Sequence, residues 1–223
     1  TVERIEAVGA KAIAHFGDVS DIEYTETLVA DIVEEFGAVH GITNFAGILR
    51  DNISYKMTGD EWDAVINVHL RGHFSLLRNA AAHWREAIGD DEDAAQRSIL
   101  NVSSRAALGN VGQANYSTAK AGILGLTRTT ANELYPYNIR VNALMPTAFT
   151  RMIEAIPEEQ RPFTREEMPP ERVAAMVAFL MSDEAEDITG CTIRSAGNEI
   201  GLVSNPELTR IGYDRDGWTA EGI

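Results

Sequence analysis

The sequence predicts an α/β fold in which a doubly wound parallel sheet lies between two layers of helices. Short apolar runs of strand length alternate along the chain with longer segments whose apolar residues recur at helical spacing. This alternation is typical of βαβ units, because parallel strands need a long, usually helical, crossover between them. The 223 residues are 44% hydrophobic, which suits one domain with a substantial core.

In the first part of the chain, three predicted elements follow one another with turn residues between them. Residues 11–16 form an apolar run that ends at Gly17-Asp18 and predicts a strand. Residues 24–36 carry an amphipathic helical pattern that a glycine terminates. Residues 41–46 predict a second short strand, and Gly47 closes it.

The middle of the chain carries the longest helical patterns. Residues 60–84 predict one long helix, which opens at Thr58-Gly-Asp-Glu61, a segment that resembles a capping box. Residues 98–102 predict a strand, and residues 115–135 predict a second long helix. Each helix thus follows a strand, as a parallel sheet requires.

The last part of the chain continues the alternation. Residues 139–144 predict a strand, residues 170–181 a helix, and a final strand begins at Cys191. We therefore predict one domain over residues 1–203. Residues 204–223 are rich in charge, glycine and proline, and we expect them to pack as an irregular extension.

Composition excludes several classes of partner. A net charge of −15 and a pI of about 4.7 argue against nucleic acid. No apolar run approaches the length of a membrane span, and the first residues lack the apolar segment of a secretory signal. The single cysteine, Cys191, excludes an internal disulfide and fits a reducing compartment. We predict a cytoplasmic protein without nucleic-acid or membrane partners.

The basic residues are unevenly divided. Of the 19 Lys and Arg residues, only Lys11, Lys56 and Lys120 are lysines. An acidic surface nearly free of lysine is expected of a halophilic protein, because molar salt screens self-repulsion. An ordinary acidic cytoplasmic enzyme is the alternative. Residues 89–93, Gly-Asp-Asp-Glu-Asp, predict a solvated loop, since clustered like charges rarely bury.

The segment Gln113-Ala-Asn-Tyr116-Ser-Thr-Ala-Lys120 carries the clearest chemical signal. Tyr116 and Lys120 are four residues apart, which places both side chains on one face of a helix. An ammonium beside a phenol favours the phenolate, so we expect Lys120 to lower the pKa of Tyr116. Such a tyrosine can exchange a proton with an alcohol or carbonyl. An amphipathic helix with a half-buried tyrosine is the structural alternative.

The surroundings of this pair resemble the short-chain dehydrogenase/reductase family over about residues 5–203. A strand ending in Ser103-Ser104 precedes the pair, and an Ala/Gly-rich helix and the run Asn138-Ile-Arg-Val-Asn-Ala-Leu-Met-Pro146 follow it. The resemblance implies a Rossmann-type fold and an oxidoreductase that uses NAD or NADP. Tyr116 would exchange the proton, Lys120 would also bind the nicotinamide ribose, and a serine would polarise the carbonyl.

Two further catalytic assignments follow from the resemblance. The family's usual spacing from Tyr116 selects Ser103 as the catalytic serine, whereas the strand register selects Ser104. The second is favoured, because loops absorb deletions more easily than strands absorb register slips. The resemblance implies a local widening of the helix at Asn67, where the Asn67 carbonyl would hold a water that relays protons to Lys120. An exposed polar helix position is the alternative.

The resemblance also implies a cofactor site. Asp18 and Val19 would contact the adenine, although a turn explains Asp18 as well. Asn44-Phe-Ala-Gly47 would let the ribose approach small residues. Pro146-Thr-Ala-Phe-Thr-Arg-Met152 would surround the nicotinamide, and residues 154–170 would form a mobile lid over the substrate. The implied cofactor-binding residues are Asp18, Val19, Asn44, Ala46, Gly47, Tyr116, Lys120, Pro146, Phe149 and Thr150.

A nucleotide-binding fold of this type opens with a strand and a glycine-rich turn that receives the pyrophosphate. The present sequence contains no such segment, and the strand would lie at the centre of the sheet. We therefore expect the natural protein to be longer at its N-terminus by roughly 30 residues or more. The alternative is that another element fills the gap. The choice between NAD and NADP stays open.

Two segments bear on the substrate. Residues 45–51 and 109–116 look most like the 3-hydroxyacyl-CoA dehydrogenase unit of multifunctional enzyme type 2, and bacterial 3-oxoacyl-thioester reductases are similar. The implied substrate is a 3-oxoacyl or 3-hydroxyacyl thioester. Another small alcohol, sugar or ketone is an alternative, and so is a non-catalytic nucleotide-binding scaffold. The resemblance further implies a homodimer or homotetramer.

The histidines show no metal-ligand spacing, so we predict surface or interface positions for them and no metal site. They are His15, His40, His69, His73 and His83.

Overall fold

The computed structural model describes residues 1–89, 95–154 and 156–222. Within them, one five-stranded sheet has the order β1-β2-β3-β4-β5. The first four strands are parallel, and β5 pairs antiparallel with β4. The strands are β1 Gly41–Asn44, β2 Arg97–Val102, β3 Ile139–Thr147, β4 Thr192–Ala196 and β5 Glu199–Val203.

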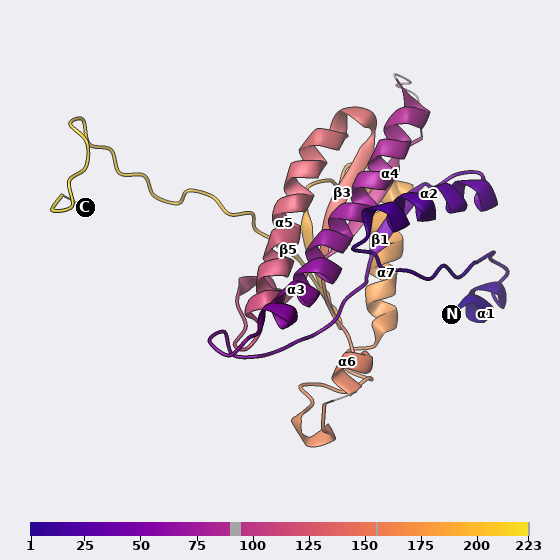
Figure 1. The fold of residues 1–223 in the computed structure, drawn as a ribbon, viewed down its shortest axis with the longest axis horizontal. Helices are drawn as coiled ribbons and strands as arrows, with labels where there is room; N and C mark the ends of the chain where they lie inside the picture. Colours follow the sequence, from indigo (N-terminus) through magenta and orange to yellow (C-terminus); the bar gives the residue numbers. More distant parts are fainter. Residues whose placement is uncertain (90–94, 155, 223) are drawn as a thin grey trace.

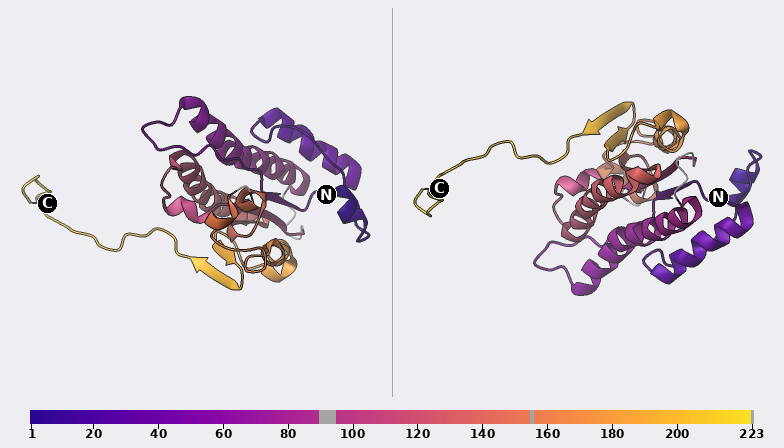
Figure 2. Two further views of the ribbon diagram at one scale, coloured as in Figure 1. Left: turned by 90° about the horizontal axis from the view of Figure 1, so that it is seen from below. Right: turned by 90° about the horizontal axis from the view of Figure 1, so that it is seen from above.

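Helices cover both faces of the sheet (Figures 1 and 2). Helices α4 and α5 pack against β1 to β3 on one face, α2 packs on α4, and α7 covers β2 to β4 on the other face. The predicted three-layered α/β fold is confirmed. The α-helices are α1 Val2–Glu6, α2 Ile22–Phe36, α3 Gly59–Ile66, α4 Gly72–Ile88, α5 Ala114–Leu134, α6 Arg151–Glu154 and α7 Pro170–Met181.

Two apolar cores lie on the two faces of the sheet. Neighbouring residues of β2 divide between them, because successive strand side chains point to opposite faces. Ile99 packs in the core that includes Trp84 of α4, and Leu100 packs in the core that includes Leu180 of α7. A strand buried on both faces reads as a continuous apolar run, which is why residues 98–102 predict it well.

The predicted start of the long central helix is confirmed. Thr58 accepts a hydrogen bond from the Glu61 amide, and the Glu61 carboxylate accepts one from the Thr58 amide. This capping box satisfies two amides that an isolated helix would leave unpaired. The predicted helix is not continuous, however, because a π-helical segment, Asn67–Arg71, separates α3 from α4.

Residues 11–16 do not form the predicted strand. They are irregular, and the Phe16 side chain is 89% exposed. An apolar run becomes a strand only when a neighbour accepts its backbone hydrogen bonds, and no described strand pairs with this segment. β1 correspondingly lies at the edge of the sheet, with β2 as its one strand neighbour in the described part of the chain.

Two other expectations, both for the second half of the chain, differ from the structure. β3 continues through Pro146 and Thr147, which pair with Ser195 and Ala196, so the predicted strand is too short by three residues. Residues 204–222 carry no helix or strand and are exposed rather than packed on the domain (Figure 1). Their apolar side chains, such as that of Leu208, find no core to enter.

Among the described residues, no helix combines the length and the apolarity that crossing a bilayer requires. Residues 90–93 of the predicted acidic loop lie outside the described residues.

Candidate active site

The carboxyl ends of the four parallel strands meet at one edge of the sheet, where ligands bind in open α/β sheets. Ser103 and Ser104 directly follow β2. The first turns of α5 bring Tyr116 and Lys120 to the same place, since both lie on one face of that helix. The residue pair that the sequence singled out therefore lies beside the two serines.

The Ser104 side chain lies near enough to the Tyr116 hydroxyl to lower its pKa by hydrogen bonding to the phenolate. Ser104 Oγ also accepts a hydrogen bond of 3.2 Å from the Ala106 amide, which holds the hydroxyl in place. Ser104 and Tyr116 come from separate elements, so tertiary packing creates this contact. A substrate oxygen placed between the two hydroxyls would meet two hydrogen-bond donors.

Ser103 lies elsewhere, although it is the adjacent residue. Its side chain is buried, and its Oγ donates a 2.7 Å hydrogen bond to the Lys120 carbonyl. This contact ties the end of β2 to α5 and turns Ser103 away from Tyr116. Of the two serines left open by the sequence, the structure brings Ser104 to the tyrosine.

Lys120 is buried, with 3% of its surface exposed. Its Nζ donates a 2.6 Å hydrogen bond to the Val102 carbonyl and lies 5.5 Å from the centre of the Tyr116 ring. Burial lowers the pKa of Lys120 from 10.5 to about 7, because desolvation penalises the ammonium.

The expected effect of Lys120 on Tyr116 is not present in this structure. Burial raises the pKa of Tyr116, the Ser104 hydrogen bond opposes this shift, and the charge of Asp51 adds to it. Lys120 is not among the causes of this shift. Tyr116 is therefore a phenol rather than a phenolate at neutral pH.

The helix widens at Asn67, as expected, because the π-helical segment Asn67–Arg71 begins there; the relay to Lys120 stays a prediction. Asn67 is exposed at the start of the π-helical segment, and its carbonyl accepts the Gly72 amide. The buried residue of this segment is His69, which is 2% exposed and packs its ring edge-to-face against Tyr116 at 5.0 Å.

Two of the five histidines are thus not at the surface, contrary to prediction. His69 and His73 are both buried, and desolvation is the largest cause that lowers their pKa values, to about 4 and about 3. Both imidazoles are therefore neutral at pH 7. Helical spacing offered a signal for this, since Val65, His69 and His73 recur every four residues on the face that meets the core.

The residues expected around the adenine and its ribose lie at the same edge of the sheet. Asp18 accepts hydrogen bonds from the amide and hydroxyl of Ser20. It therefore forms a turn, the role that the sequence offered as the alternative to an adenine contact. Val19 packs against Gly72, where an added Cβ would approach the valine to 2.8 Å. One carboxylate oxygen of Asp18 makes both turn contacts, which leaves the other for a ligand.

Asn44, Ala46 and Gly47 follow the end of β1. The buried Asn44 amide donates to Asn101, and Ala46 and Gly47 are exposed. Gly47 is required here because a Cβ would lie 2.5 Å from the His69 ring. The exposed backbone without bulky side chains fits the close approach of a ribose.

The segment expected around the nicotinamide begins within β3. Pro146 lies in that strand, the Phe149 amide donates to the Met168 carbonyl at 2.7 Å, and the exposed Thr150 precedes α6. The Phe149–Met168 contact joins this segment to the region expected to form a lid. The Thr150 hydroxyl has no hydrogen-bond partner among the described residues, so it is free to contact a ligand.

These residues fit a nicotinamide nucleotide in their chemistry. Ser104 and Tyr116 supply hydroxyls, and Lys120 supplies a buried ammonium that can donate to ribose hydroxyls. Of the expected cofactor residues, the structure engages Asp18 in a turn, Asn44 in a core hydrogen bond and the Phe149 amide in a backbone contact. Phe149 can therefore offer its carbonyl, but not its amide, to a carboxamide.

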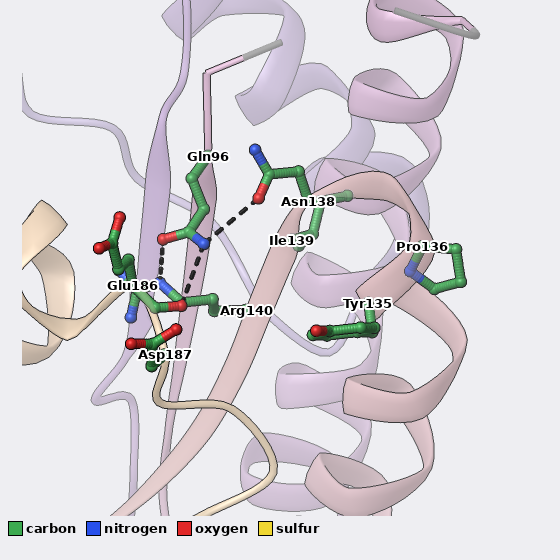
Figure 3. Close-up of a pocket in the computed structure, with 8 residues that line it drawn as sticks. All are labelled: Gln96, Tyr135, Pro136, Asn138, Ile139, Arg140, Glu186 and Asp187. Atoms are coloured by element: carbon green, nitrogen blue, oxygen red, sulfur yellow. Dashed lines mark hydrogen bonds between the residues drawn. The ribbon is translucent and has the colours of Figure 1, made fainter. Parts of the chain in front are cut away.

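A second polar cluster lies at the amino ends of β2 and β3, opposite the Tyr116 site. Figure 3 shows Gln96 between Asn138, Arg140 and Glu186, with hydrogen bonds to all three. The cluster lines a cavity of about 360 Å³. Arg140 also donates to the carbonyls of Leu180 and Ser182 at 2.9 and 3.0 Å, so each nitrogen of its guanidinium has an acceptor.

Comparisons with known proteins identify the family. Residues 1–197 match the family model described as enoyl-(acyl carrier protein) reductase. The chain is 41% identical to a Mycobacterium tuberculosis protein named hydroxyacyl-CoA dehydrogenase ChsB1, over 91% of this chain and 65% of that protein. It is 36% identical to the Thermotoga maritima 3-oxoacyl-[acyl-carrier-protein] reductase FabG, over 91% of this chain and 81% of that protein.

A solved structure agrees with the sequence relatives. A short chain dehydrogenase from Mycobacterium avium superposes with a TM-score of 0.87 at 37% identity, covering 99% of this chain and 72% of that one. The chain thus spans just under two thirds of the mycobacterial hydroxyacyl-CoA dehydrogenase and nearly three quarters of the solved structure. By sequence, fold and the placement of Tyr116 and Lys120, the chain belongs to the short-chain dehydrogenase/reductase family.

Proposed function

We propose that the protein is an NAD(P)-dependent oxidoreductase that interconverts a carbonyl and a secondary alcohol, with a 3-oxoacyl or 3-hydroxyacyl thioester as substrate. The juxtaposition of Ser104 and Tyr116, one helical turn from the buried Lys120, carries this proposal. A scaffold that only binds nucleotide has no use for a desolvated lysine, because burying an ammonium costs free energy.

The chain's own residues divide the chemistry among them. Ser104 donates a hydrogen bond to the carbonyl oxygen and orients it. Tyr116 delivers its phenolic proton to that oxygen as charge develops there. Lys120, buried one helical turn from Tyr116, holds the ribose side of the site. A bound nicotinamide cofactor supplies or accepts the hydride.

The raised pKa of Tyr116 favours one direction. Reduction needs a protonated phenol, and burial keeps Tyr116 protonated at neutral pH. Oxidation needs the phenolate as the base, which forms at higher pH. We therefore propose that carbonyl reduction is faster near pH 7 and that alcohol oxidation gains as pH rises.

The choice of substrate rests on the relatives. One relative is named for hydroxyacyl-CoA and another for 3-oxoacyl-[acyl-carrier-protein], and both names describe a thioester with oxygen at carbon 3. We extend this class to the present chain. We also propose that the protein works in the cytoplasm of a halophile as a homodimer or homotetramer, on the grounds of its charge, its lysine content and its family.

The test is the variant Tyr116→Phe in the full natural chain, assayed with acetoacetyl-CoA and NADH or NADPH in high KCl. Removing the proton donor should lower kcat about a hundredfold or more while nucleotide binding stays near wild type. Tyr213→Phe is the matched control, because Tyr213 is 87% exposed in the C-terminal extension.

Wild-type turnover in Tyr116→Phe would overturn the assignment of the proton donor. If the wild-type protein reduces other carbonyls but not acetoacetyl-CoA, its substrate is a small ketone, sugar or alcohol rather than a thioester. Tight nucleotide binding without turnover on a broad carbonyl panel would show that the protein is a nucleotide-binding scaffold and not an enzyme.

A further inference from the structure

His73 is a buried histidine to which the proposed chemistry gives no role. It lies in the first turn of α4, and 1% of its surface is exposed. Its Nε2 accepts a 3.1 Å hydrogen bond from the amide of Val102, the last residue of β2. Desolvation holds the pKa of His73 at about 3, so at neutral pH Nε2 keeps the lone pair that this bond needs. The contact joins α4 to the strand that leads into the site.

The Val102 amide needs a side-chain partner because the neighbouring strand ends before it. The register pairs Asn44, the last residue of β1, with Asn101, the residue before Val102. On the other side β3 continues, and the Leu144 carbonyl accepts the next amide, that of Ser103, at 2.8 Å. Buried backbone amides are almost always paired. The imidazole therefore takes the place of the acceptor that β1 no longer supplies.

Val102 is also the residue that holds Lys120. Its carbonyl accepts the Lys120 Nζ at 2.6 Å and is the one acceptor that the described residues offer to this ammonium. The next residue, Ser103, donates to the Lys120 carbonyl at 2.7 Å. Val102 thus bonds to α4 through its amide and to α5 through its carbonyl, and Ser104 follows two positions later. A displacement of Val102 would move both the lysine and the serine.

The need to fill space does not explain a histidine at this position. Leucine or phenylalanine would also fill the interior beside β2, but would leave the Val102 amide unpaired. Nor do all buried polar residues of α4 reach the site. Asn79, 4% exposed, donates at 2.8 Å to the carbonyl of Ile22 and to the hydroxyl of Thr25, and both partners belong to α2. Along α4, His73 is therefore the residue whose hydrogen bond leads toward Lys120.

We propose that His73 is a positioning residue of the active site. By holding the Val102 amide, it fixes the carbonyl that receives Lys120 and the start of the segment that carries Ser104. His73 acts through Val102 and exchanges no proton in the reaction. The effect on turnover rests on the proposed function, but the anchoring of Val102 and Lys120 does not.

Two substitutions separate the two nitrogens of the ring. Glutamine places its amide oxygen near the position of Nε2 and can accept the Val102 amide, whereas asparagine reaches only to the position of Nδ1. Both variants lose the aromatic ring, so a comparison between them cancels effects of the ring itself. Asn79→Ala is the control, because Asn79 is also buried in α4 but bonds to α2. Circular dichroism and the thermal midpoint of each full-length variant establish that it folds.

The first readout is amide hydrogen exchange, which needs neither cofactor nor substrate. The Val102 amide is compared with the Ser103 amide, which bonds to β3 and not to His73. In His73→Asn the Val102 amide should lose about tenfold in protection relative to Ser103, the equivalent of one hydrogen bond. His73→Gln and Asn79→Ala should keep the wild-type ratio.

The second readout is NMR of the Lys120 side chain, which can be resolved because the chain has only three lysines. If His73 fixes the acceptor of the ammonium, the Lys120 signals should move in His73→Asn and stay near their wild-type positions in His73→Gln. The loss of the ring is common to both variants and cannot cause a difference between them.

The third readout is turnover per folded molecule. His73→Asn should lower kcat about tenfold, the equivalent of one hydrogen bond, and His73→Gln should recover kcat to within about threefold of the wild type. Asn79→Ala should lower the thermal midpoint and leave kcat near the wild-type value. A histidine that only stabilised the core would change the midpoint, with the same kcat in both His73 variants.

The outcomes distinguish the two proposals. Equal kcat in the two His73 variants overturns the positioning role, and so does a loss of kcat in Asn79→Ala as large as that in His73→Asn. Val102 protection and Lys120 signals that respond alike to both His73 substitutions overturn the anchoring as well. If the wild type lacks turnover but these two NMR readouts separate asparagine from glutamine, the proposed function fails and the anchoring stands.

Discussion

Two cations are buried at opposite ends of the same sheet, and they differ in how many hydrogen-bond acceptors surround them. Arg140, 4% exposed, lies at the amino end of β3 with an acceptor for each guanidinium nitrogen (Figure 3). Lys120, 3% exposed, lies at the carboxyl ends of the strands with one acceptor in the described structure. Burial lowers the pKa of both, and to about 7 for Lys120.

The difference separates a structural charge from a reactive one. A guanidinium stays charged in any protein, and a full set of hydrogen bonds makes it a fixed link between β3, α7 and residue Gln96. An ammonium is a compact charge that changes its pKa readily on burial. Incomplete pairing leaves Lys120 able to bind a ligand and to exchange a proton near neutral pH.

The largest expected effect comes from Lys120→Met. Turnover should fall about a hundredfold or more, because the ammonium proposed to hold the cofactor ribose is lost. The free energy of unfolding of the variant should depend less on pH than that of the wild type. In the wild type the unfolded lysine binds a proton up to pH 10.5 and the folded one only up to about pH 7. The free energy of unfolding therefore rises with pH between these values, by at most about 1.4 kcal/mol per unit.

Urea unfolding of wild type and Lys120→Met from pH 6.5 to pH 10 measures this slope. The variant should show a flatter profile over that range, and equal slopes would contradict the depressed pKa of Lys120.

Arg140→Met should show the opposite pattern. The Ser182 carbonyl loses its guanidinium donor, and the Leu180 carbonyl keeps only the hydroxyl of Ser98, so the free energy of unfolding should fall by about 2–3 kcal/mol. Turnover per folded molecule should stay near wild type, since Arg140 lies at the other end of the sheet. Denaturant unfolding and active-site titration measure the two quantities. A large loss of kcat in the folded fraction would break the distinction between the two cations.

The smallest effect is expected from Gln96→Ala, which removes one of the acceptors of Arg140. The glutamine is at least partly exposed and water can replace it, so the free energy of unfolding should fall by only about 1 kcal/mol. Chemical denaturation resolves this difference. A loss as large as that in Arg140→Met would show that Gln96 alone holds the guanidinium.

Much of the fold could be predicted from the sequence, because its signals are local. The capping box at Thr58 and the helix over residues 170–181 are confirmed to the residue. Residues 11–16 show the limit of such signals. Their apolar pattern is that of a strand, but a strand forms only with a neighbour, and pattern says nothing about the neighbour.

The site shows the same division. Tyr116 and Lys120 were found because one helix turn joins them, a relation that spacing alone expresses. His69 was predicted at the surface or an interface, and the structure buries it beside Tyr116. The four-residue spacing of Val65, His69 and His73 carried a signal for this burial, but spacing does not say which segment packs against that helix face.

By itself, the sequence determined the alternation of strands and helices, the family and the pairing of Tyr116 with Lys120 on one helix face. Each of these depends on residue types at fixed short spacings. Only the tertiary structure decided that Ser104 rather than Ser103 meets Tyr116, that burial raises the pKa of Tyr116, and that His69 lies beside it. These depend on desolvation and on contacts between segments far apart in the chain, and neither is a property of local sequence.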